Sequence, residues 1–297
     1  MVYTDLLKPG FKAILMERLS DERINRESLV MNDSEEPIPG WLALDFDGVV
    51  WDSVGECYQM ALLTWEQMGL SPKPSSASSG PDATILDPLE IRFRAGRHLC
   101  RTAHDFHVLL DILVENPTLD PGLTDLESFA RARVRTREVA DRFDSLFYPL
   151  RDDYRNHDFE TWLSWQKPMQ GVPAAIRRLK ARLNGLSITT TKDEPSVRRI
   201  LKTLDLDLDV IGKETTRDKG EQILIFAQQS GTTPDRVILL DDVGENLEMA
   251  REVGAGAALA CWGYNTSRER DRARAAGYSL VGQSTLESDL KEAFQTL

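Results

Sequence analysis

The chain has 297 residues and is 41% hydrophobic, enough for a packed core in one large or two moderate domains, which argues against global disorder. Its formal net charge of −12 disfavours general binding to nucleic acid or to an anionic membrane, although local cations or a metal can still attract a small anion. The three cysteines are far apart and include no CxxC pair, so neither a disulfide framework nor a structural zinc site is expected.

The N-terminal segment, residues 1–40, is interpreted as a helical extension that ends in the turn signal at 35–40. Hydrophobic residues recur at helical spacing within residues 1–36, which predicts one or two helices. The segment is charged throughout and lacks the apolar region of a signal peptide, and no run in the chain approaches the ~20 apolar residues of a membrane span. Together with the few cysteines, these features predict a cytoplasmic protein without a membrane partner.

A short apolar run at residues 41–44 predicts a first strand that is buried on both faces and ends at two acids. The next segments are a helical pattern at 57–70, a loop rich in Ser, Pro and Gly at 71–83, and a long helical pattern from about 87 to 166. The long pattern contains no convincing strand. An insertion of this length must carry its own fold, so residues 57–166 are expected to form an all-helical domain.

From residue 168 onward, strand and helix patterns alternate. The expected strands are 186–191, 208–212, 236–240 and 257–262, the last being the final strand. The expected helices are 172–183, 195–204, 219–231 and 245–254. This alternation predicts an α/β fold, with residues 41–56 and 167–297 forming a Rossmann-like parallel sheet that has helices on both faces.

Polar residues gather where these strands are expected to end, at the edge where parallel sheets bind ligands. The residues concerned are Asp45 and Asp47, the run Thr189-Thr190-Thr191-Lys192, Lys219 at a helix start, and Asp241-Asp242 with Asn246 nearby. Three of the acids, Asp45, Asp241 and Asp242, would crowd like charges, which is costly without a cation. Oxygen ligands without His or Cys favour Mg²⁺ as that cation.

This set of residues suits phosphoryl transfer. A carboxylate such as Asp45 can attack phosphorus and form an aspartyl phosphate. A second acid, Asp47, can protonate the leaving alcohol and then activate water. Magnesium, Lys219, a Thr hydroxyl and the backbone amides after Asp45 would neutralise the phosphoryl oxygens. The sequence therefore predicts a Mg²⁺-dependent phosphatase acting on a small phosphorylated metabolite, and it leaves the oligomeric state open.

The run Asp45-Phe46-Asp47-Gly48-Val49 matches the DxDx[TV] motif of the haloacid dehalogenase superfamily. Residues 41–56 and 168–285 resemble the core of its phosphoglycolate-phosphatase-like members, and the insertion stands where a helical, C1-type cap stands. The resemblance implies that Asp45 is the nucleophile and a metal ligand. It implies that Asp47 is the general acid/base and gives the metal its backbone carbonyl.

The resemblance assigns Thr190 to the second motif, Lys219 to the third, and Asp241 with Asp242 to the fourth. Many members have Gly-Asp at the fourth motif and an acid at the position of Asn246. Which of the two acids binds the metal directly therefore stays open; Asp242 is favoured, with Asp241 in support. Asn246 fits a helix N-terminus as well as it fits a site role.

The assignments of the lysine, the threonine and the arginines also stay open. Lys213 competes with Lys219, and alternation along the strand leaves Thr189 and Thr191 in competition with Thr190. The arginines Arg94, Arg97 and Arg101 lie near one helical face, which is more often solvated or salt-bridged than functional. If that face is functional, Arg94 and Arg97 would bind a second anionic group of the substrate. Phe46 and Thr191 complete the candidate substrate-binding set.

Several functions compete with that of a phosphatase. A phosphomutase would use the arginine face to hold a bisphosphate, and a phosphonatase would need a cap lysine, of which residues 74–166 have none. A dehalogenase would not need an acid at Asp47. The altered fourth motif would also suit a catalytically weak binding or regulatory protein. For an enzyme, we expect the cap to close over the substrate, with hinges near 54–57 and 165–171.

Overall fold

The computed structural model describes residues 36–70, 87–124 and 126–297; the helices expected within 1–36 and the loop expected at 71–83 therefore lie almost wholly outside the described residues. The chain divides into two compact units. The first contains residues 36–51, Pro168–Gly263 and Ser267–Leu297, and the second contains Asp52–Lys167 with Tyr264–Thr266. The described residues include no helix with the length and apolar character needed to span a membrane.

The first unit is built on a six-stranded parallel sheet in the order β5-β4-β1-β6-β7-β8. The strands are β1 (Ile38–Leu44), β4 (Leu183–Thr189), β5 (Asp209–Ile211), β6 (Val237–Asp241), β7 (Gly256–Ala260) and β8 (Ser279–Val281). The order of the strands reverses at β1, which has β4 on one side and β6 on the other. In open sheets of this kind, the carboxyl end of such a strand faces a crevice that binds ligands.

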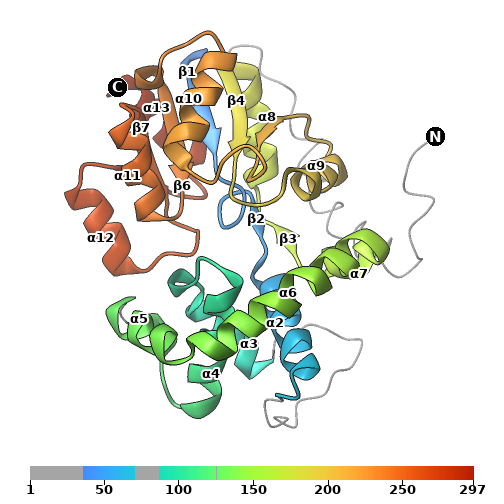
Figure 1. Ribbon diagram of the computed structural model, residues 1–297. Coiled ribbons are helices and arrows are strands. Elements are labelled where there is room, and N and C mark those ends of the chain that lie inside the picture. The colour runs from blue at the N-terminus through green and yellow to red at the C-terminus, as the bar shows by residue number, and fades with distance from the viewer. Residues whose placement is uncertain (1–35, 71–86, 125) are drawn as a thin grey trace. The chain divides into compact units, whose positions relative to one another are not determined.

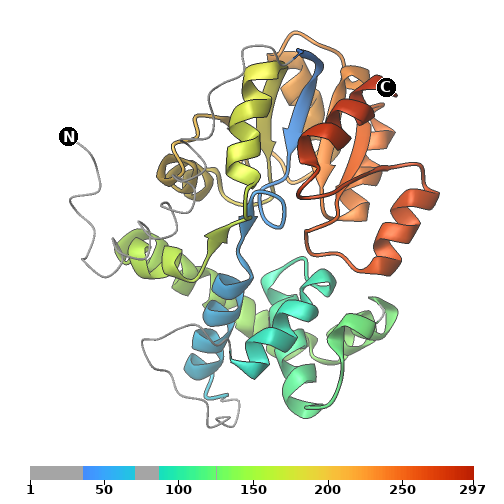
Figure 2. The same cartoon turned by 180° about the vertical axis from the view of Figure 1, so that it is seen from behind.

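Helices cover both faces of this sheet. They are α8 (Val172–Arg182), α9 (Glu194–Thr203), α10 (Lys219–Gln229), α11 (Gly244–Glu252), α12 (Ser267–Ala275) and α13 (Leu286–Gln295). Helices α10 and α11 pack on the face seen in Figure 1, and α8 and α13 pack on the face seen in Figure 2. Because β1 is covered on both sides, its residues Leu42, Ala43 and Leu44 are all buried, as the continuous apolar run predicted. The predicted Rossmann-like α/β fold is confirmed.

Two boundaries of the sheet differ from the prediction. Residues 257–262 are not the final strand, because β8 follows, and its three residues are too short to form a recognisable periodic pattern. Strand β1 begins at Ile38, so the end of the segment assigned to the N-terminal extension belongs to the sheet. The sheet register shifts between Ile38 and Trp41, and this irregularity accommodates Pro39, which has no N–H to donate.

The second unit contains helices and no strand between Val54 and Ser164 in its described part. The helices are α2 (Val54–Gln67), α3 (Pro88–Ala95), α4 (Ala103–Glu115), α5 (Leu126–Arg135), α6 (Arg137–His157) and α7 (Phe159–Ser164). Its core is aromatic: the rings of Phe93, Phe106, Phe143 and Phe147 lie within 5.5–5.9 Å of one another in a chain of contacts. Two short strands, β2 (Trp51–Asp52) and β3 (Lys167–Pro168), pair where the chain enters and leaves this unit.

A buried ion pair fastens three helices of the second unit. Glu56 on α2 is fully buried and accepts hydrogen bonds from Arg151 on α6, both at 2.6 Å. Its Oε1 also accepts a bond from the indole N–H of Trp162 on α7, at 2.8 Å. Removing one member of a buried ion pair leaves the other charge without compensation, which costs much more than the pair itself contributes.

Replacing Glu56 by Ala should therefore destabilise the second unit by about 3–5 kcal/mol, because the Arg151 guanidinium and the Trp162 indole N–H would lose the buried carboxylate that both contact. Urea unfolding followed by tryptophan fluorescence measures the loss. The matched control is Glu127→Ala, which breaks an ion pair with Arg131 whose side chains are 85% and 61% exposed. That change should cost less than ~1 kcal/mol. Equal losses from the two variants would contradict the role assigned to Glu56.

Candidate active site

Three carboxylates meet at the carboxyl ends of β1 and β6. Leu44 pairs with Leu240 in the sheet, and the N–H of Asp45 donates to the Leu240 carbonyl at 2.9 Å. This register brings Asp45 beside Asp241 and Asp242, so that one oxygen of each carboxylate lies within 4.8 Å of the other two. All three side chains are buried, which is unusual for acids unless they are paired or bind a cation.

A buried lysine lies among these acids. Lys219, the first residue of α10, has its ammonium 2.6 Å from Asp45 Oδ1 and 3.3 Å from Asp241 Oδ2. The ammonium also donates to the carbonyl of Thr189 at the end of β4, at 2.5 Å. Lys213, the competing candidate, is half-buried and bonds through its backbone N–H to the Lys192 carbonyl. The structure therefore brings Lys219 to the carboxylates.

Electrostatics in this cluster favour a bound cation. Burial raises the pKa of Asp45 well above its usual range; Asp241 and Asp242 act in the same direction, and Lys219 opposes them. Burial alone would lower the pKa of Lys219, but Asp45 and Asp241 outweigh it and raise that pKa. One ammonium does not balance three carboxylates. The donor set consists only of oxygen atoms, so it fits Mg²⁺.

The two acids of the fourth motif have different surroundings. Asp241 accepts hydrogen bonds from the backbone N–H of Val243 at 2.9 Å and from the Asn246 amide at 3.0 and 3.1 Å, in addition to its contact with Lys219. The side chain of Asn246 thus supports a site carboxylate, and the N-cap residue of α11 is Val243. Asp242 lies instead against the backbone of Gly48 and Gly263.

The segment after Asp45 makes a tight turn. The Phe46 carbonyl accepts from Val50 and Trp51, both at 2.9 Å, and Gly48 has a φ of +88°. The Phe46 ring is fully buried and stacks on Trp51 with ring centroids 6.2 Å apart. Phe46 can therefore reach a bound group only through its backbone. A side chain at Gly48 would overlap the Asp242 carboxylate, so glycine allows this close approach.

Asp47 is paired separately. Its carboxylate, with 24% of the side chain exposed, lies 3.1 and 3.3 Å from the ammonium of Lys192. It does not belong to the cluster of three acids. The sequence placed Lys192 among the polar residues at the end of a strand but gave it no role, although it directly follows the threonines of the second motif. Its loop follows the end of β4, where strand alternation no longer predicts the direction of a side chain.

The three competing threonines lie at or just after the end of β4. Thr190 is buried, and its hydroxyl accepts the backbone N–H of Lys192 at 3.1 Å. Thr191 is exposed. The Thr189 hydroxyl is buried without a hydrogen-bond partner among the described residues, whereas its carbonyl holds Lys219. The carbonyl of Thr189 thus helps to hold Lys219, and the hydroxyl of Thr190 helps to hold the backbone of Lys192.

The candidate arginines are engaged inside the second unit. Arg94 pairs with Asp52 at 2.9 Å and with Glu90 at 3.0 Å, which agrees with the interpretation of a salt-bridged face. The guanidinium carbon of Arg97 lies 4.8 Å from the ring centroid of Tyr264. Arg97 also donates to the carbonyl of Cys100 at 2.6 Å. A second anionic group would have to compete with Asp52 and Glu90 for Arg94, whose side chain is 25% exposed.

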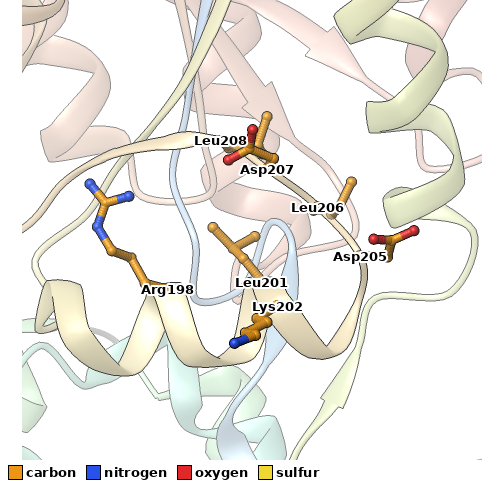
Figure 3. Close-up of a pocket in the computed structure, with 7 residues that line it drawn as sticks. All are labelled: Arg198, Leu201, Lys202, Asp205, Leu206, Asp207 and Leu208. Carbon is orange, nitrogen blue, oxygen red and sulfur yellow. The ribbon is translucent and has the colours of Figure 1, made fainter. Parts of the chain in front are cut away.

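A hollow of about 310 Å³ in the first unit lies away from these acids. It is lined by residues at the end of α9 and just before β5, which are Arg198, Leu201, Lys202, Asp205, Leu206, Asp207 and Leu208 (Figure 3). These residues precede β5, whereas Asp45 follows β1. Because the two strands are parallel, the hollow lies at the opposite edge of the sheet.

Comparison with known proteins identifies the same family that the sequence motif resembles. The sequence model of the haloacid dehalogenase-like hydrolases matches residues 41–254. A phosphoglycolate phosphatase of Aquifex aeolicus (strain VF5) is 27% identical over 118 residues, which cover 37% of this chain and 55% of that protein. The chain thus matches about half the length of this curated relative.

Solved structures show the same fold. A haloacid dehalogenase-like family protein from Streptococcus pneumoniae is 16% identical, with a TM-score of 0.52 over 84% of this chain and 96% of that one. A HAD family hydrolase from Deinococcus radiodurans R1, with bound phosphate and sodium, is 15% identical, with a TM-score of 0.51 over 87% and 97%. At these identities the likeness concerns the fold.

Replacing Gly48 by Ala should destabilise the protein by about 1–3 kcal/mol, because Ala is strained at positive φ and its methyl group meets Asp242. The matched control is Gly231→Ala, where φ is +63° and no atom lies within 4 Å of an added Cβ. That variant should lose less, since only backbone strain remains. Urea unfolding compares the two, and a larger loss at Gly231 would contradict the close approach to Asp242.

Proposed function

The chain belongs to the haloacid dehalogenase-like hydrolase family, and from this premise we propose that it is a magnesium-dependent phosphatase acting on a small phosphate monoester. One observation carries the proposal: the buried carboxylates of Asp45, Asp241 and Asp242 lie within 4.8 Å of one another, with Lys219 2.6 Å from Asp45. The phosphatase name of the Aquifex relative adds support for the reaction.

In the proposed mechanism, Asp45 attacks phosphorus to form an aspartyl phosphate, and the bond from phosphorus to the ester oxygen breaks. Asp47 gives its proton to the leaving oxygen. It then accepts a proton from the water that hydrolyses the intermediate. Lys219 and the backbone N–H of Phe46 would offset charge on the phosphoryl oxygens. Thr190 would complete the phosphate site, with Thr191 at its exposed side.

The residues present fit a magnesium ion. Asp45, Asp242 and the backbone carbonyl of Asp47 would hold it, and Asp241 would support the site because its carboxylate already accepts bonds from Lys219, Val243 and Asn246. The bound ion would neutralise charge on the transferring phosphoryl group. This division of roles favours Asp242 as the direct ligand of the fourth motif.

The second unit is proposed to act as a C1-type helical cap that excludes water when substrate is bound, with hinges near 54–57 and 165–171. Such an insertion after the first strand would select the substrate. Arg94 is held by Asp52 and Glu90, so we favour the phosphatase over the alternative of a phosphomutase, which would use the arginine face to hold a second phosphate. The three cysteines form no disulfide bond with one another, which fits the proposed cytoplasmic location.

Turnover of p-nitrophenyl phosphate tests the function. Wild-type protein should hydrolyse it with Mg²⁺ and lose the activity in EDTA. Asp45→Asn should lower kcat by about 10³-fold or more while the protein stays folded, because the amide is no nucleophile. The control Asp235→Asn alters an exposed acid that precedes β6, at the opposite edge, and should keep full activity. A folded wild-type protein that turns over no phosphate monoester, or an active Asp45→Asn variant, would refute the proposal.

Metal binding can be measured without activity. Mg²⁺ should raise the melting temperature, with a stabilisation of about 2.7 kcal/mol when its concentration is 100 times the Kd. Asp242→Asn should remove most of this shift, because the ion loses a carboxylate ligand, whereas Asp235→Asn should keep it. Differential scanning fluorimetry across a magnesium titration gives the answer. If Mg²⁺ raises the melting temperature of Asp242→Asn as much as that of wild-type protein, Asp241 would be the direct metal ligand instead.

A further inference from the structure

The two acids assigned to catalysis each have their own lysine. Asp45 is paired with Lys219, and Asp47 is paired with Lys192, which stands on a different loop. The Lys192 side chain is only 2% exposed, and its ammonium contacts both oxygens of the Asp47 carboxylate, at 3.1 and 3.3 Å. Contact with both oxygens restrains the rotation of the carboxylate as well as its position.

The backbone around Lys192 is held on both sides. Its N–H donates to the Thr190 hydroxyl at 3.1 Å, and its carbonyl accepts the N–H of Lys213 at 3.2 Å. The next residue, Asp193, caps α9 by accepting the N–H of Ser196 at 3.0 Å. The ammonium is thus carried by an ordered segment that joins the ends of β4 and β5 to the start of α9.

Burial makes this lysine dependent on a carboxylate. An ammonium that has lost nearly all contact with water is costly unless a negative charge lies opposite. Asp47 is the more exposed member of the pair, at 24%, and stands next to the turn at Gly48. The Lys192 side chain is therefore the more buried of the two, and its ammonium can restrain the carboxylate of Asp47.

We propose that Lys192 is a positioning residue that holds the Asp47 carboxylate in the orientation needed for proton transfer. The inference rests on the proposed function, in which Asp47 is the general acid/base. A group that donates a proton must lie within hydrogen-bond reach of the receiving atom. A misplacement of about 1 Å can lower the rate by roughly 10²-fold.

The leaving group distinguishes this role from substrate binding. A p-nitrophenolate ion leaves without a proton, whereas an alkoxide such as ethoxide needs one. If Lys192 acts through Asp47, its loss slows hydrolysis most for the esters whose leaving oxygen most needs a proton. If Lys192 contacts the phosphoryl group or only maintains the fold, every ester slows equally. The value of kcat/KM reports the step in which the ester bond breaks, so it is the quantity to compare.

The experiment measures kcat/KM of Lys192→Gln for p-nitrophenyl, phenyl and ethyl phosphate with Mg²⁺. We expect a loss of less than about threefold for p-nitrophenyl phosphate, rising to roughly 10²-fold for ethyl phosphate. The control Lys202→Gln removes a lysine that lines the hollow of Figure 3, on the exposed side of α9, and should change none of the three values. An equal loss for all three esters would overturn the proposal.

Two further variants isolate the contact. In an Asp47→Asn background, Lys192→Gln should cost less than about threefold with phenyl phosphate, because there is no acid left to position; a full additional loss would overturn the proposal. Lys192→Arg keeps the charge and can contact both oxygens, so it should recover part of the ethyl phosphate activity. If Lys192→Gln does not fold, Lys192→Arg replaces it in the test. Its loss of kcat/KM should be smaller, and it should again be largest for ethyl phosphate. If wild-type protein hydrolyses no ester, it is the proposed function that fails.

Discussion

The buried ammonium of Lys219 is the interaction on which the rest of the site depends. It lies between the carboxylates of Asp45 and Asp241, fully excluded from water, and also holds the carbonyl at the end of β4. Acids as close as these repel one another strongly in a medium of low polarity. The Lys219 ammonium contacts residues at the carboxyl ends of β1, β4 and β6. Because Lys219 is the first residue of α10, these contacts also hold the start of that helix at the site. The remaining negative charge is what a hard cation would offset.

The two acid–lysine pairs differ in how deeply they are buried. Lys219 and Asp45 are 0% and 10% exposed at their side chains, whereas Lys192 and Asp47 are 2% and 24% exposed. A nucleophile has to stay in place, and its pair is the more deeply buried. A group that transfers protons to a leaving oxygen and from water needs contact with both, and Asp47 is the acid left partly open. The gradient in exposure therefore matches the proposed division of labour.

Much of this site followed from the sequence because a parallel sheet places the ends of its strands together. The apolar run before Asp45 and the run before Asp241 were sufficient to predict that their acids meet. Contacts made by loop residues could not be predicted in this way. Lys192 lies past the last paired residue of β4, where no period governs side-chain direction, and Arg94 finds its partner Asp52 42 residues away in sequence. Strand β8 was missed because three residues carry no pattern.

The departures in the fourth motif compensate each other. Many family members combine Gly-Asp with an acid four residues after the second of these positions, whereas this chain combines Asp241-Asp242 with Asn246. The amide of Asn246 donates to both oxygens of Asp241, at 3.1 and 3.0 Å, where an acid would repel them. The side chain of Asn246 therefore stabilises the carboxylate of Asp241, which the Lys219 ammonium also contacts, so the two departures from the common pattern fit each other.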